Sequence, residues 1–201
     1  MPIEEIVLPL PVPRERVVPA TQFRSTWVVA SLQGLRAGGH FDRYERQLSA
    51  EHRDAVLHCV AGTWLPMPVA TAHYEACQSL NLTIEEQLTM GDAVGGRGSA
   101  TLIATASRAA KGAGVTPWAV FPQLDRIWRR GANGGAVTVA RTGPKEALGE
   151  VVGCALFDLP YFRNAFRGVV HGMTRAFCSS MYVRETGTRS RGEVRLRFQW
   201  S

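Results

Sequence analysis

The stretch Met181-Tyr182-Val183-Arg184-Glu185, with its continuation Val194-Arg195-Leu196-Arg197-Phe198-Gln199-Trp200, decides the fold of this chain. Apolar and polar residues alternate in both segments, which is typical of strands with one buried and one solvated face. A short link, Gly187 to Gly192, joins them. We therefore predict that the chain ends in an antiparallel hairpin.

Upstream of the hairpin, apolar residues recur about every 3.6 residues instead of every 2, which is the spacing of a helix. Pro160 opens a predicted helix over residues 161–177, with apolar side chains along one face. Two further segments, 136–141 and 147–156, alternate as strands, and Thr142-Gly143-Pro144-Lys145 forms the turn between them. The C-terminal third, Val137 to Trp200, is thus predicted to fold as ββαββ.

Helical periodicity dominates the region from Ser25 to Arg130. Predicted helices begin near Ser25, Ser49, Val69, Thr83 and Pro117. Thr83 and Glu86 have the spacing of a capping box. Four glycines interrupt the fourth helical region, which predicts two helices or one kinked helix there: Gly91, Gly95, Gly96 and Gly98.

This order of segments predicts an α+β fold. N-terminal helices are followed by ββαββ, and helices cover one face of a four-stranded antiparallel sheet. Residues 1–22 contain five prolines and form a proline-rich extended arm, which could lie along the domain, lie along a partner or be loose. Residues 23–201 form a single α+β domain.

Composition excludes several classes of protein. The net charge of +6 comes from 23 basic residues that are scattered along the chain, so we do not expect nucleic-acid binding. We expect no membrane span, and the acidic, proline-rich start is unlike a signal peptide, which together predict a cytoplasmic protein. The four cysteines are far apart in sequence and are predicted to be reduced core residues rather than zinc ligands: Cys59, Cys77, Cys154 and Cys178.

A set of turns and apolar faces over about residues 25–200 resembles known proteins. It consists of Trp64-Leu65-Pro66, Leu80-Asn81-Leu82-Thr83, Gly91 to Gly98, Gly114-Val115-Thr116-Pro117-Trp118, Gly134-Gly135, Gly143-Pro144, Leu159-Pro160-Tyr161-Phe162-Arg163 and Trp200. With the element order, it resembles the superfold of 4-vinyl-reductase-type sensor domains, haem nitric-oxide-binding domains and small vesicle-tethering subunits. It resembles more closely an uncharacterised paralogous family abundant in myxobacteria.

This resemblance implies two roles. The sensor relatives hold a small apolar or planar ligand between helices and sheet, and the tethering relatives use the fold to build protein interfaces. The chain lacks the clustered cysteines of the zinc-bearing sensors, because Cys178 is followed by Ser179-Ser180. It also lacks the tyrosine–serine–arginine motif of the haem members. The resemblance therefore implies no zinc and no haem, and we expect no cofactor.

Several polar residues are candidates for chemical sites. His171 and Cys178 should point to roughly the same side of the chain, and His73 and Cys77 share a helix face at i, i+4. Neither pair supplies enough ligands for a metal, so structural roles are favoured. Gly95-Gly96-Arg97-Gly98 lacks the spacing and the lysine of a phosphate loop. We predict no catalytic residues and no metal site.

Aromatic residues from helices and strands should meet above the sheet. If they enclose a cavity, we expect its lining to include Trp118, Phe121, Phe162, Phe166, Met173, Met181 and Trp200. Arg163 and Arg167, at i, i+4 on one helix, either bind an acidic group of a ligand or a partner, or form a solvated face, which is favoured.

The sequence therefore predicts a non-enzymatic, cytoplasmic, sensor-like or regulatory domain that binds a small, apolar ligand or a protein partner. One alternative is a protein–protein assembly module, such as a homodimer, in which the arm docks onto a neighbour. A weaker alternative is an enzyme with an unrecognised site.

Overall fold

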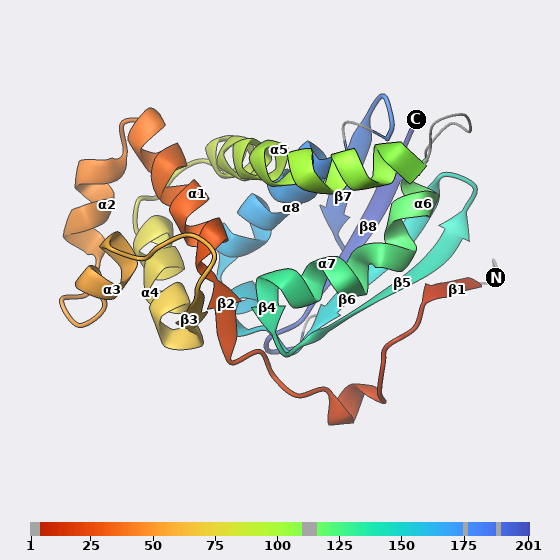
Figure 1. Ribbon diagram of the computed structural model, residues 1–201, viewed down its shortest axis with the longest axis horizontal. Helices are drawn as coiled ribbons and strands as arrows, with labels where there is room; N and C mark the ends of the chain where they lie inside the picture. Colours follow the sequence, from red (N-terminus) through yellow and green to blue (C-terminus); the bar gives the residue numbers. More distant parts are fainter. Residues whose placement is uncertain (1–4, 110–115, 175–176, 188–189) are drawn as a thin grey trace.

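A computed structural model describes residues 5–109, 116–174, 177–187 and 190–201, with only the backbone of residues 97–109. Of the resemblance motifs, Gly114 and Val115 lie outside these residues. Figure 1 shows a bundle of short helices at one end and a twisted sheet covered by longer helices at the other. None of the described helices is both long and apolar enough to cross a bilayer.

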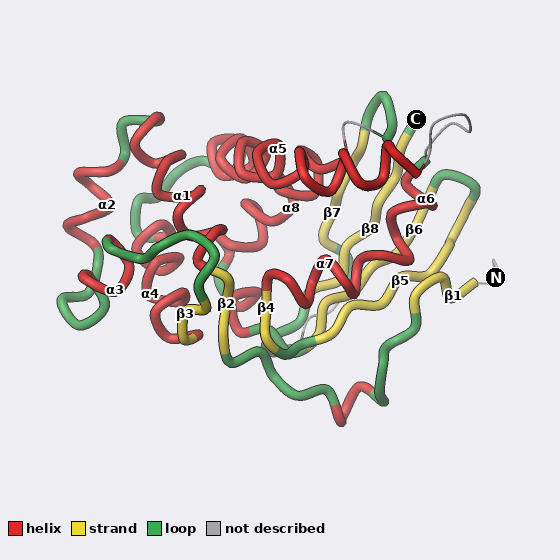
Figure 2. The backbone as a smooth tube through the Cα atoms, viewed as in Figure 1, coloured by secondary structure: helices red, strands yellow, loops and turns green. Residues whose placement is uncertain are grey.

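The helical end contains α1 (Ser25–Ala37), α2 (Phe41–Gln47), α3 (Arg53–Leu57) and α4 (Met67–Gln78). The helices over the sheet are α5 (Ile84–Ala109), α6 (Pro117–Val120), α7 (Leu124–Gly131) and α8 (Pro160–Thr174). Of the 3-10 turns in the described residues, η1 (Arg14–Arg16) lies in the N-terminal arm, η2 (Phe121–Gln123) lies between α6 and α7, and η3 (Ala155–Asp158) precedes α8. Figure 2 separates the two kinds of structure, with the helices in red on one side of the yellow sheet.

The main sheet has five antiparallel strands in the order β1-β5-β6-β8-β7. They are β1 (Glu5–Leu8), β5 (Ala136–Gly143), β6 (Glu146–Val152), β7 (Met181–Glu185) and β8 (Val194–Trp200). In β8 every second residue is buried and the others are exposed, as the alternation predicts. The predicted α+β fold with helices over one sheet face is confirmed, and one strand more than the predicted four joins the sheet.

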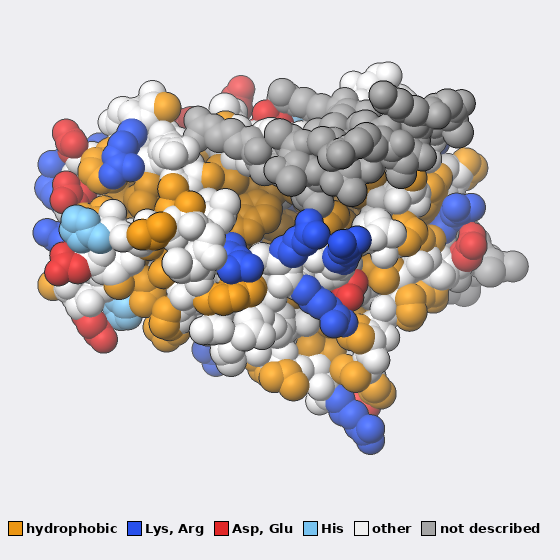
Figure 3. All heavy atoms as spheres, in the orientation of Figure 1, with side chains coloured by type: hydrophobic (Ala, Val, Ile, Leu, Met, Phe, Trp, Pro, Cys, Tyr) orange, Lys and Arg blue, Asp and Glu red, His pale blue; other side chains and the backbone are white. Residues whose placement is uncertain are grey.

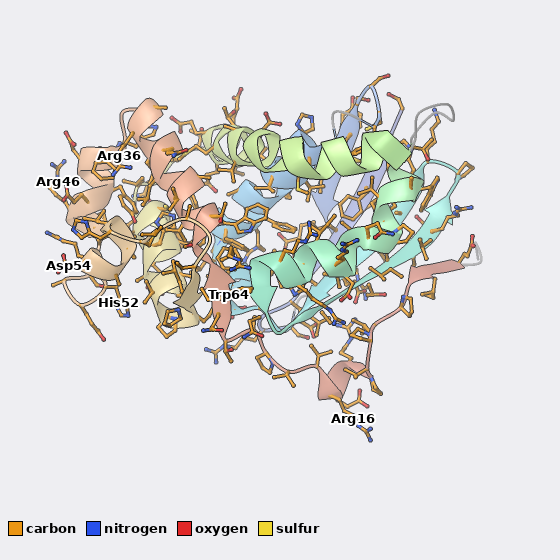
Figure 4. All side chains as sticks on the ribbon, in the orientation of Figure 1. Arg16, Arg36, Arg46, His52, Asp54 and Trp64 are labelled. Carbon is orange, nitrogen blue, oxygen red and sulfur yellow. The ribbon has the colours of Figure 1, made fainter. Side chains whose placement is uncertain are left out.

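The additional strand comes from the proline-rich arm. β1 pairs with β5, with Glu5 opposite Arg141 and Ile6 opposite Ala140. Further along the arm, the Arg14 guanidinium forms ion pairs with Glu150 and Glu193 on the outer face of the sheet. Arg16 points away from the domain in Figure 4. Of the three placements that the sequence left open, the arm in this structure lies along its own domain.

A second, three-stranded sheet links the two ends of the molecule. β2 (Gln22–Arg24) pairs with β3 (Trp64–Pro66) on one side and with β4 (Ala132–Asn133) on the other. The Arg24 guanidinium lies 4.0 Å from the centroid of the Trp64 ring. Phe23 is buried between Tyr74 and Phe162, at ring-centroid distances of 6.1 and 5.9 Å. The small sheet thus fixes the helical end against the larger sheet.

Of the two arrangements predicted for the fourth helical region, two separate helices is wrong, because α5 is one helix through all four glycines. A Cβ atom on Gly91 would lie 1.8 Å from the Ala165 carbonyl oxygen, and one on Gly95 would lie 2.2 Å from that of Val169. On α8, Gly168 and Gly172 are in equally tight contact with the α5 backbone. The glycines therefore let two helix backbones approach closely.

Two other local predictions had different outcomes. The capping box is confirmed, since the Thr83 amide donates to the Glu86 carboxylate at 2.7 Å and the Glu86 amide donates to the Thr83 hydroxyl at 3.3 Å. The single helix predicted from Trp118 to Arg130 is wrong. Pro122 lacks an N–H, and the chain forms a 3-10 turn there that separates α6 from α7.

Candidate functional site

A cavity of about 460 Å³ lies between the sheet and the helices that cover it. Its volume is within the range of small-molecule sites in proteins, roughly 300–1,000 Å³. Its walls include residues of α1, α4, α5, the α6–α7 segment, α8, β2 and the inner face of the main sheet. It therefore lies where the two ends of the molecule meet.

The cavity walls are predominantly apolar. The sheet contributes the inward residues Val137, Val139, Val151, Leu196 and Phe198, which follow from the two-residue period of the strands. The helices contribute Trp27, Met90, Val94, Ile127, Trp128, Phe162, Phe166, Val170 and Met173. Gly149 lies on this face too, and a Cβ there would be only 2.6 Å from the Phe198 ring. The lining suits a ligand whose body is apolar.

Two tyrosines bring hydroxyl groups to the cavity. Tyr161 donates to the Met90 sulfur at 3.6 Å, and no hydrogen bond among the described residues uses the Tyr74 hydroxyl. Burial raises the pKa of Tyr74 and of Tyr161 well above the ordinary value of a phenol. Both groups are therefore protonated, and Tyr74 has a donor to offer to an acceptor on a ligand.

Some of the predicted lining residues face the cavity, and others lie outside it. Phe121, Phe162, Phe166 and Met173 line the cavity. Trp118, Met181 and Trp200 do not. Trp118 lies beyond the cavity wall, with its ring centroid 4.9 Å from that of Trp200, and its indole N–H donates to the Pro144 carbonyl at 2.8 Å. Met181 is opposite Trp200 in the β7–β8 pair and is buried.

Sequence reasoning missed Trp27, Tyr74 and Val139 as lining residues. Each lies on an apolar face that the sequence pattern indicates, but a residue facing a cavity and one facing packed core have the same spacing. The sequence of α7 does carry one indication of a polar edge beside apolar residues. Arg126 and Arg130 are one helical turn apart and flank apolar Ile127 and Trp128.

The histidine–cysteine pairs are structural. His73 is fully buried, and its Nδ1 is 2.6 Å from the Tyr44 hydroxyl while its Nε2 is 3.8 Å from the Cys77 sulfur. Burial lowers the pKa of His73 to about 3 and raises the pKa of Cys77 to about 12. An uncharged histidine and a protonated thiol in the core fit packing and hydrogen bonding.

His171 and Cys178 are not brought together. The His171 Nδ1 is 2.7 Å from an Asp92 carboxylate oxygen on α5, whereas the Cys178 thiol donates to the Thr174 carbonyl at 3.5 Å. Within the described residues, no group of three or more His, Cys, Asp or Glu could hold a metal ion.

Arg163 and Arg167 do not form the solvated face, because both guanidinium groups contact other parts of the domain. Arg163 pairs with Glu185 at 3.1 Å and donates to the Phe157 carbonyl at 2.8 Å. Arg167 donates to the Val183 carbonyl at 3.0 Å. The two guanidinium groups tie α8 to β7 and η3.

No family model matches the chain, and no curated protein is similar to it in sequence. Solved structures do match. An oxygen-binding H-NOX domain related to soluble guanylate cyclases, in its oxygen complex, is 12% identical, with a TM-score of 0.55 over 88% of this chain and 94% of that chain. A mutant of the T. tengcongensis H-NOX is 14% identical, with a TM-score of 0.55 over 88% and 97%. A structure from a study of heme distortion in the H-NOX family is 14% identical, with a TM-score of 0.56 over 88% and 94%.

The fold is that of H-NOX domains. The resemblance to haem nitric-oxide-binding domains is thus confirmed at the level of the fold. At these identities the similarity carries no further, so whether the cavity suits a haem has to be judged from its own residues.

The described lining does not fit an iron-ligated haem. Proteins hold haem iron with histidine, cysteinate, tyrosinate, or methionine together with histidine. No histidine or cysteine is among the described residues that line the cavity, and Tyr74 and Tyr161 are held in the protonated form. Met90 and Met173 have no histidine beside them in the described lining, so the methionine–histidine set is absent there. An organic ligand without iron fits the lining better.

Proposed function

We propose that this chain is a non-enzymatic, sensor-like domain that binds a small, largely apolar organic ligand without iron ligation. The observation that carries the proposal is the cavity between sheet and helices, which is lined by apolar residues and has an unused phenol donor on Tyr74. A ligand there touches α1, α7, α8 and the sheet at once. Its binding would therefore favour one relative placement of the two ends of the molecule.

Native mass spectrometry of freshly purified protein is the first test. We expect part of the protein to carry an added organic mass that is lost on denaturation. Catalytic turnover that disappears on a single polar substitution would contradict the non-enzymatic proposal.

A cavity-filling substitution provides a sharper test. Val139 is fully buried in β5 and faces the cavity, so V139F should occupy part of the ligand's space and abolish binding. Because the added atoms enter empty volume, the free energy of unfolding without ligand should stay equal or rise by about 1 kcal/mol. Titration of purified ligand, followed by tryptophan fluorescence from Trp27 and Trp128, measures the binding.

The matched control is L148F. Leu148 lies in β6 next to Gly149, which is opposite Val139, but the Leu148 side chain is on the outer face of the sheet and does not line the cavity. The L148F protein should bind ligand as tightly as the unmodified protein does. Equal binding by V139F and L148F would show that the ligand does not occupy the cavity.

Two further inferences concern the location and the assembly of the protein. The four free cysteines are compatible with a cytoplasmic location, which we infer for the protein. We also infer that it acts through a protein partner or as a homodimer, as the resemblance to the small vesicle-tethering subunits implies. The assembly alternative, in which the arm docks onto a neighbour, is tested by light scattering of a chain without residues 1–22. If the arm holds the assembly together, the oligomeric mass should fall.

A further inference from the structure

Two arginines of α7 lie at the edge of the cavity. Arg126 and Arg130 are among the lining residues, yet both side chains are exposed, so they belong to the opening rather than to the interior. Their spacing of four residues puts them on one side of the helix. Figure 3 shows basic side chains over α7, beside apolar atoms visible between α1, α5 and α7.

The carboxylates near these arginines are used elsewhere. Asp125 pairs with Arg129 at 2.9 Å. Glu150 borders the cavity, but its carboxylate pairs with Arg14 and Arg195 on the outer face of the sheet. Among the described residues, no ion pair or hydrogen bond engages the guanidinium group of Arg126 or of Arg130.

A third arginine adds to the positive charge. The Arg24 Nε donates to the Arg130 carbonyl oxygen at 3.2 Å, and its guanidinium also donates to the Gly62 carbonyl at 2.8 Å. Like charges at i, i+4 on a helix repel each other, so an anion bound between Arg126 and Arg130 would relieve that repulsion. Guanidinium groups match carboxylates in shape and bind them through two hydrogen bonds.

We propose that the ligand is an amphiphilic carboxylic acid, with its apolar body in the cavity and its carboxylate between Arg126 and Arg130. This inference rests on the proposed function and adds the charge and the orientation of the ligand. The apolar body contacts Val139, Phe166 and Ile127, while the carboxylate stays at the opening, where it keeps part of its hydration. A charged group buried among the inner residues would instead face mostly apolar atoms and a few uncharged hydroxyl groups, such as that of Tyr74.

The test compares two probes that differ only in charge, dodecanoate and 1-dodecanol, by isothermal titration calorimetry below their aggregation limits. We expect dodecanoate to bind about tenfold more tightly at low ionic strength, a modest factor because the arginines are exposed. The preference should shrink when the ionic strength is raised to about 0.5 M, because salt screens exposed charges.

Variants assign the preference to its residues. R126Q/R130Q should lose the preference for dodecanoate and keep the affinity for 1-dodecanol. R129Q is the matched control, since Arg129 lies on the same helix but pairs with Asp125 and does not line the cavity. R129Q should retain the preference.

The outcomes separate the two proposals. Equal binding of both probes, abolished by V139F, would overturn the carboxylate inference and leave the proposed function standing. A preference that survives in R126Q/R130Q would also overturn the assignment to these arginines. If neither probe binds to the unmodified protein, both this inference and the proposed apolar site are wrong.

Discussion

G95A is expected to destabilise the protein by about 3 kcal/mol, whereas G96A, at the next residue, should stabilise it by about 0.5 kcal/mol. A Cβ on Gly95 would lie 2.2 Å from the Val169 carbonyl oxygen of α8, and the atom it meets is backbone, which cannot turn aside. A Cβ on Gly96 has no neighbour within 4 Å. At that position alanine only lowers the conformational entropy of the unfolded chain.

Urea unfolding of the two variants and the unmodified protein, monitored by circular dichroism, measures both effects. The pair is informative because both changes add one methyl group to the same helix. If the helix were broken or kinked at these glycines, both alanines would act in the same direction. Equal effects of G95A and G96A would therefore contradict the close crossing of α5 and α8.

The crossing also matters for the cavity. Met90 and Val94 of α5 line it, as do Val170 and Met173 of α8, so a change in the distance between the helices changes its walls. G95A protein that still folds should bind ligand less tightly than G96A protein does.

The second large effect concerns pH. His73 has a pKa of about 3 in the folded protein, because burial disfavours its charged form, against about 6.5 when unfolded. The unfolded chain therefore binds a proton that the folded chain does not bind between pH 6.5 and pH 3. The free energy of unfolding therefore does not depend on the titration of His73 above pH 6.5. Between pH 6.5 and pH 3 it falls by up to about 1.4 kcal/mol for each pH unit.

H73Q should remove this part of the pH dependence. Glutamine does not titrate, and its side-chain oxygen can accept the hydrogen bond that the Tyr44 hydroxyl forms with His73. Between pH 7 and pH 4.5 we expect the unmodified protein to lose about 2 kcal/mol more than H73Q loses. Urea unfolding at a series of pH values measures the difference.

The control for H73Q is H58Q, because His58 is exposed and lies outside the buried network of Tyr44, His73 and Cys77. H58Q should show the same slope of stability with pH as the unmodified protein. If H73Q and H58Q have identical slopes, His73 is not held neutral in the folded state.

Much of the secondary structure could be predicted from short-range patterns. The alternation in Val194–Trp200 gave β8, and the capping box at Thr83 placed the start of α5. These features follow from the strand pleat and from the unpaired amides at a helix start, which involve residues close in sequence. The break at Pro122 was also available from the sequence, because proline has no N–H to continue a helix.

The glycines show where such reasoning fails. A glycine lowers helix propensity whatever surrounds it, so Gly91 and Gly95 look like a break when only their own helix is considered. Their spacing of four residues is repeated by Gly168 and Gly172 on α8, and that shared spacing is the signal of a close crossing. Only the second helix explains why the residues must be small.

The cavity depended on the tertiary structure in the same way. Sequence periodicity fixed which faces of the strands and helices are apolar, and it placed Phe162 and Phe166 on the inner face of α8. It could not determine whether those faces meet in full contact or leave space, because a cavity is the small difference between the volumes of side chains from distant segments. The hairpin of β7 and β8 was therefore fixed by its own residues. The site above it depends on how the helices, β2 and the main sheet are placed relative to one another, which only the tertiary structure decides.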